Sequence, residues 1–302
     1  MKKYLLFATA FIMVFSGMKS FAQIAVLSGP EQGSYYEFVG DMAGVLNSDT
    51  VKLITNTTTE GAAVNLENIA DPKSPYKIGL VQEDYLYYMQ NQDLIQNTSK
   101  LKNIKVVMPL AREEIHLVTL KNSGINGIRD ITDSTMIAIG KRSQGTYTTA
   151  NNIKDKTRIF WMSLPVLYED ALRMLLINQM DAFFVVGSAP LEKLNVNPQA
   201  LAEEITLVPL ENYNDWAKYY DEDVIAAGIY KWLEEDVPTF SVQSLLVVNE
   251  SKLTDEDREL LNEVITGITE NLETLRQSGH PKWKEVDLTD WDKSDWPVYE
   301  SE

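Results

Sequence analysis

The stretch IAVLSGPEQGSYY, residues 24–36, carries the pattern from which the fold of this chain is predicted. Its four apolar residues, 24–27, predict a short buried strand, and residues 28–30 are typical of the turn that ends one. Gly33 and Ser34 then begin a predicted helix. Its apolar positions recur at helical spacing: Tyr36, Val39, Met42, Ala43 and Leu46. A helix that starts directly after such a turn presents free backbone N–H groups, which bind anions and small polar ligands well.

The same pattern returns in the second half of the chain. Gln32-Gly33-Ser34-Tyr35 corresponds to Gln144-Gly145-Thr146-Tyr147, and the apolar stretch 136–139 corresponds to the strand before the first turn. Two similar strand–turn–helix units therefore predict two similar lobes.

Composition and charge limit the classes of protein to which this chain can belong. At 302 residues the chain is long enough for two domains of ordinary size, each with a core of its own. Apolar residues make up 44% of it and charged residues 24%, which is typical of a globular protein. Because the formal net charge is −17 and the sequence has no basic stripe, nucleic acid is not expected as a partner.

The N-terminus has the pattern of a cleaved secretory signal peptide over residues 1–22. Lys2 and Lys3 precede an apolar run, 4–15, that is too short to span a membrane comfortably, and Ser20-Phe21-Ala22 offers a small-x-small cleavage site. The sequence contains no cysteine, so neither disulfides nor thiolate chemistry is expected. A signal peptide without cysteines favours the bacterial periplasm.

Beyond the opening unit, strand patterns alternate with helical ones. Strands alternating with helices at this spacing predict an α/β fold with a doubly wound, mainly parallel sheet in each lobe. We place the first lobe at 23–112, the second at 113–238, and the return to the first lobe, with a long helix after Thr254, at 239–302. The further predicted strands cover residues 51–55, 77–81, 104–108, 114–120, 136–139, 159–162, 182–186, 205–210 and 242–248.

Catalytic patterns are weak in this sequence, so we expect no enzyme, no metal site and no cofactor. Neither of the two histidines, His116 and His280, has a partner at the spacing of a metal site or a catalytic triad. The glycine-containing stretch 140–145 comes near two motifs. It has one residue too many for a nucleophile elbow, and Thr146-Tyr147 stands where a phosphate-binding loop needs Lys-Ser or Lys-Thr.

Polar residues at the predicted strand ends favour a binding site instead. Ligands of doubly wound sheets lie at the carboxyl ends of strands, beside helix starts. Neutral donors there, with one or two cations close by, suit a small carboxylate, although each residue by itself is more simply a turn-former or a helix cap. The candidate ligand-binding residues are Gly33, Ser34, Tyr35, Thr59, Gly61, Asn65, Gln82, Arg112, Ser143, Gly145 and Thr146.

Five short elements of the sequence occur in an order typical of one known family. They are Gln32-Gly33-Ser34-Tyr35-Tyr36, the stretch 59–65, Gln82-Glu83-Asp84, the stretch 140–146 and the stretch 181–184. Together they resemble the solute-binding subunits of the TAXI group of TRAP transporters, which are periplasmic receptors for a sodium-driven membrane carrier. Two positions depart from the family pattern: Ala62 replaces a serine, and Gln144 is inserted between a serine and a glycine.

The resemblance implies a two-lobed periplasmic-binding-protein fold that closes around one small ligand and performs no chemistry on it. Ligands of this group are glutamate, glutamine or related carboxylates, and the partners are the membrane subunits of a TRAP transporter. A monomer is the default expectation. Two alternatives stay open: a periplasmic sensor of the same fold coupled to a membrane signalling protein, and a periplasmic enzyme, such as a dehydratase that uses Glu83 or Asp84 as its base.

Overall fold

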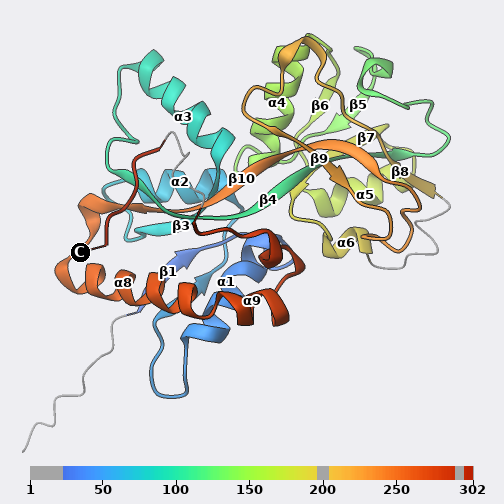
Figure 1. Cartoon of the computed structure of the whole chain (residues 1–302). Coiled ribbons are helices and arrows are strands. Elements are labelled where there is room, and N and C mark those ends of the chain that lie inside the picture. Colours follow the sequence, from blue (N-terminus) through green and yellow to red (C-terminus); the bar gives the residue numbers. More distant parts are fainter. Residues whose placement is uncertain (1–22, 196–203, 290–295, 302) are drawn as a thin grey trace, which may run out of the picture.

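Figure 1 shows the computed structural model of this chain, which describes residues 23–195, 204–289 and 296–301. The predicted signal peptide, 1–22, lies outside the described residues. The strands are β1 (Ile24–Leu27), β2 (Ile54–Thr57), β3 (Ile78–Gln82), β4 (Ile104–Leu120), β5 (Met136–Ala138), β6 (Met162–Leu164), β7 (Ala182–Gly187), β8 (Ile205–Leu207), β9 (Asp221–Ile225) and β10 (Val237–Asn249). The α-helices are α1 (Ser34–Leu46), α2 (Ala62–Ala70), α3 (Glu83–Gln96), α4 (Gly145–Thr157), α5 (Tyr168–Leu176), α6 (Glu192–Asn195), α8 (Asp255–Glu270) and α9 (Leu272–Ser278). Within the described residues, no helix combines the length and the apolar character that crossing a membrane requires.

The strands of the described chain form one mixed, ten-stranded sheet. Its main path is β2-β1-β3-β10-β4-β7-β5-β6, with β8 beside β4 and β9 beside β10. β1 pairs in parallel with β2 and β3, and β5 pairs in parallel with β6 and β7. The strands in the middle of the sheet add antiparallel pairs to these. The predicted α/β fold class is confirmed.

Helices cover both faces of the sheet. In the first half of the molecule, α1, α8 and α9 pack on one face, and α2 and α3 pack on the other (Figure 1). Neighbouring residues of β1 point to opposite faces, so Val26 belongs to one core and Leu27 to the other. The buried face of α1 differs slightly from the predicted one, because Tyr35 and Phe38 lie in the core whereas Tyr36 is half-buried.

Two long strands, β4 and β10, connect the halves of the molecule (Figure 1). β4 is a single strand of 17 residues, where two strands, 104–108 and 114–120, were predicted. Pro109, which donates no backbone hydrogen bond, lies opposite Leu245 beside a register shift in β10. A ladder with such an irregularity tolerates the missing donor, and the strand therefore continues through the proline.

The second half repeats the strand–turn–helix unit of the first. β5 precedes α4 as β1 precedes α1, and the two helices have 13 residues each. β2 and β6 begin at Ile54 and Met162, later than the predicted 51 and 159. β9 was not predicted, because its sequence, DEDVI, is mostly charged and exposed; its pairing with β10 defines it as a strand.

Candidate ligand-binding site

A cavity of about 100 Å³ lies where the two halves of the molecule meet, beside the starts of α1 and α4. An apolar cavity that holds benzene has roughly 150 Å³, so this space is small even for a small molecule. The lining residues are Gly29, Pro30, Gln32, Gly33, Ser34, Tyr35, Glu60, Gly61, Ala62, Gln82, Glu113, Gly140, Gln144, Gly145, Thr146, Tyr168, Glu169, Phe184, Val185, Val186, Gly187 and Leu191.

Most of the predicted site residues line this cavity. They are Gly33, Ser34, Tyr35, Gly61, Gln82, Gly145 and Thr146. The N-caps of α1 and α4 are Gly33 and Gln144, and neither side chain accepts a hydrogen bond from its helix. The first N–H groups of both helices, at the positive ends of the two helix dipoles, therefore lie at the cavity without a capping side chain. Such a pair of helix starts favours a negatively charged ligand group between them.

Two of the predicted residues, Thr59 and Asn65, support the cavity from behind rather than line it. Asn65 is fully buried, and its amide group donates to the carbonyl oxygens of Ser28 at 2.6 Å and Leu80 at 2.7 Å. The Thr59 hydroxyl in turn donates to Asn65 Oδ1 at 2.6 Å. These bonds connect α2 with β3 and with Ser28, directly after β1, so they hold in place the elements that carry the ligand-facing residues.

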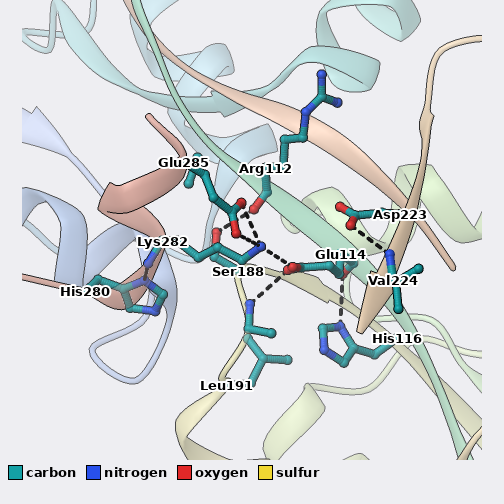
Figure 2. Close-up of polar contacts among 12 residues, drawn as sticks. Arg112, Glu114, His116, Ser188, Leu191, Asp223, Val224, His280, Lys282 and Glu285 are labelled. Carbon is teal, nitrogen blue, oxygen red and sulfur yellow. Dashed lines mark hydrogen bonds and ion pairs between the residues drawn. The ribbon is translucent and has the colours of Figure 1, made fainter. Parts of the chain in front are cut away.

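The remaining two predicted residues, Arg112 and Ser143, also lie outside the lining. Arg112 forms an ion pair with Asp221, and its guanidinium points away from the cluster around Glu114 (Figure 2). The predicted cation is therefore not at the cavity. Ser143 contributes to the contact between the two halves through its backbone: its carbonyl oxygen accepts a 3.3 Å hydrogen bond from the Val64 N–H of the other half.

Glu113 is a buried cavity residue that was not predicted. It is 3% exposed and accepts a 2.9 Å hydrogen bond from Tyr35 Oη. Burial raises the pKa of the Glu113 carboxyl to about 8, the hydrogen bond from Tyr35 partly opposes this shift, and the Asp84 carboxylate adds to it. The sequence does contain one indication of a buried carboxyl group here: glutamates 113 and 114 are adjacent and lie between apolar stretches. Side chains alternate along a strand, so two adjacent glutamates point to opposite faces of the sheet.

Glu114 lies on the opposite side of β4, where it meets a lysine of the C-terminal segment (Figure 2). Lys282 pairs with Glu114 and also donates to Glu285 at 2.7 Å. Burial raises the pKa of Glu114, and Lys282 partly offsets that shift. On the same side, His116 lies between the Glu114 carbonyl and the Tyr230 hydroxyl, and burial lowers its pKa to about 4. These contacts hold β4 in place and lie outside the cavity lining.

Hydrogen bonds and close packing also connect the two halves of the molecule directly. Asp84, at the start of α3, accepts hydrogen bonds from the Thr149 hydroxyl at 2.6 Å and the Tyr220 hydroxyl at 2.8 Å. Gly145 approaches Gln82 so closely that a Cβ atom on the glycine would stand 1.4 Å from Gln82 Oε1. A larger residue at this point of contact would therefore force the Gln82 side chain to move.

The mixed sheet, with a cavity between its two halves, defines the two-lobed fold of the periplasmic binding proteins. The chain belongs to the NMT1-like family, whose model matches residues 26–297.

Three solved structures are similar to this chain in fold. A periplasmic sulfonate-binding protein, SsuA, of a putative sulfonate ABC transporter from Methylobacillus flagellatus KT is 14% identical, with a TM-score of 0.50 over 85% of this chain and 70% of that one. A chain from the structural work on glutathione import via GshT and the cystine ABC importer TcyBC of Streptococcus mutans is 11% identical, with a TM-score of 0.51 over 89% and 97%. A substrate-binding protein of an ABC uptake transporter from Streptococcus pneumoniae, solved with bound histidine, is 13% identical, with a TM-score of 0.50 over 89% and 94%.

Proposed function

We propose that this chain is an extracytoplasmic solute-binding receptor, which captures a small carboxylate or amino acid of the glutamate or glutamine class by closure of its two lobes. The observation that carries the proposal is the cavity bounded by one helix start from each half, that of α1 and that of α4. A ligand held there contacts both halves at once. Contacts that exist only in the closed form shift the population toward closure.

The partner we propose is the membrane portion of a TRAP transporter, and the compartment is the periplasm. The ordered motifs that resemble the TAXI group support the partner, and the signal-peptide pattern over 1–22 supports the compartment. In this proposal residues 23–112 and 239–302 form one lobe and residues 113–238 the other, and β4 and β10 serve as the connections between them. A monomeric receptor is sufficient for this role, since the cavity is built from one chain.

A ligand screen with a matched pair of glycine variants tests this proposal. The chain from Gln23 onward is screened by thermal shift against amino acids, dicarboxylates and keto acids. A ligand at a hundredfold excess over its Kd stabilises the native state by about 2.7 kcal/mol. Gly145→Ala places a methyl group against Gln82, whereas Gly44→Ala, in α1, places one where no atom lies within 4 Å.

We expect a ligand to shift the Tm of the wild type and of Gly44→Ala equally and to shift that of Gly145→Ala little or not at all. Absence of any shift across the panel contradicts the receptor function. An equal shift in all three proteins contradicts the position of the site.

A further inference from the structure

The charges on the cavity wall restrict which ligands fit it. Among the lining residues that the structure describes there is no lysine, arginine or histidine, whereas three are glutamates: Glu60, Glu113 and Glu169. Glu60 is exposed and Glu169 is half-buried, but Glu113 is 3% exposed and forms no ion pair with any described residue. A ligand that is only anionic finds two helix starts here, but it brings no positive charge that would favour the ionised form of the buried Glu113 carboxyl.

Gln82 adds a second unused acceptor beside Glu113. Its side chain is 2% exposed and lines the cavity, and its Oε1 atom has no hydrogen-bond partner in the described structure. The amide of Gln82 donates to the Glu113 carboxylate, so its NH₂ end is the one turned toward Glu113 and its oxygen is the free end. A buried acceptor without a donor is unfavourable, and a ligand donor would satisfy this oxygen if it approached beside the close contact with Gly145.

We propose that the ligand carries a protonated amino group which binds to Glu113 and Gln82, so that the receptor takes a zwitterionic amino acid rather than a simple carboxylate. An ammonium group brings three donors and one positive charge, which matches one carboxyl group and one free amide oxygen. The ligand carboxylate then lies at the starts of α1 and α4. This inference rests on the proposed function and specifies the substrate class of the same site.

Binding of such a ligand is coupled to release of a proton. Burial raises the pKa of Glu113 to about 8, and the groups that face it are Tyr35 from α1, Gln82 from β3, Asp84 from α3 and Glu114 beside it on β4, none of them cationic. At pH 7 the free carboxyl is therefore mainly protonated. An ammonium group in contact with it favours the ionised form, so close to one proton leaves on binding at this pH.

Calorimetry with ligands of matched carbon skeleton tests the inference. The probes are L-amino acids, each compared with the 2-oxo acid and the deaminated acid of the same skeleton, for example L-glutamate, 2-oxoglutarate and glutarate. We expect the amino acid of the set that binds to do so at least tenfold more tightly than its two partners. Titrations in phosphate and in Tris, whose ionisation enthalpies differ, should report net release of protons at pH 7 that diminishes as the pH rises above about 8.

Two glutamate variants separate the role of Glu113 from the general acidity of the cavity. Glu113→Gln should weaken binding of the amino acid at least tenfold and abolish proton release. Glu31→Gln removes a charge from the exposed surface beside the cavity, outside its lining, and should change the Kd by less than about twofold. Circular dichroism and the Tm of each variant establish that it is folded before titration.

Equal or tighter binding of the oxo acid or the deaminated acid overturns the inference and leaves the receptor function standing. Amino-acid binding that releases no proton and is unchanged in Glu113→Gln overturns it as well. A wild-type chain that binds no member of the panel contradicts the proposed function, and the inference with it.

Discussion

Glu113→Gln is expected to change the pH dependence of stability in a defined direction. Glutamine keeps the size of the protonated carboxyl but cannot ionise. In the folded protein the pKa of Glu113 is about 8, and in the unfolded chain it returns to the ordinary 4.5. Because the folded pKa of this acid is raised, the folded state binds more protons between these two values. The free energy of unfolding of the wild type therefore falls as pH rises from about 4.5 toward 8, and this contribution is absent from the variant.

The size of the effect follows from the two pKa values. Each pH unit between them is worth about 1.4 kcal/mol, and from pH 5 to pH 7 a single site with these values loses roughly 2–3 kcal/mol. Since Glu113 is 3% exposed, solvent screening reduces this figure little. Urea denaturation of the ligand-free wild type and of Glu113→Gln at pH 5, 6 and 7 measures the difference.

Titrating groups that do not interact with Glu113 contribute to both proteins and cancel in that difference, whereas Asp84, which acts on the pKa of Glu113, cancels only in part. The variant should gain stability relative to the wild type as pH rises. Parallel pH profiles would refute the reasoning, and so would a variant that loses stability faster than the wild type.

Four further substitutions have expected outcomes. Lys282→Met leaves Glu114 buried without its cation and should lower the free energy of unfolding by about 3 kcal/mol in urea denaturation; an unchanged midpoint contradicts the role of this pair. Asn65→Ala removes the donors for two backbone carbonyls and should cost about 2–4 kcal/mol in the same assay; an unchanged midpoint contradicts the structural role of Asn65. Tyr220→Phe removes a 2.8 Å hydrogen bond between the halves, so the ligand-free protein should show a larger radius of gyration by X-ray scattering than the wild type. Arg112→Ala should leave the Kd of the ligand within about twofold of the wild-type value by calorimetry, because the Arg112 guanidinium pairs with Asp221 outside the cavity. A tenfold loss of affinity would show that this arginine contributes to ligand binding.

The parts of the fold that depend on local sequence could be predicted. The turn and helix start at Gly33 and its counterpart at Gly145 are specified by neighbouring residues, and both helices begin there as predicted. β4 and β9 depend on partners far along the chain. Pro109 lies within one strand because β10 accommodates it, and the acidic segment of β9 is extended because β10 pairs with it.

The candidate site was predictable to the extent that it consists of helix starts. Thr59 and Asn65 stand near a helix start in sequence, but the Asn65 amide donates to the carbonyl groups of Ser28 and Leu80 and Thr59 donates to Asn65, an arrangement that only packing decides. Alternation along β4 explains the charged residues. It turns Glu113 toward the cavity and its neighbours Arg112 and Glu114 away from it, and the sequence alone does not specify which face of this strand the cavity occupies.

Small-angle X-ray scattering of the chain from Gln23 onward tests most directly whether a ligand closes the two lobes. The measurement is made with and without a saturating concentration of the amino acid that binds most tightly in calorimetry. We predict that the ligand reduces the radius of gyration of the wild type and not that of Gly145→Ala, in which the close contact with Gln82 is blocked. A ligand that binds in the cavity and leaves the wild-type radius unchanged would contradict closure as the mechanism.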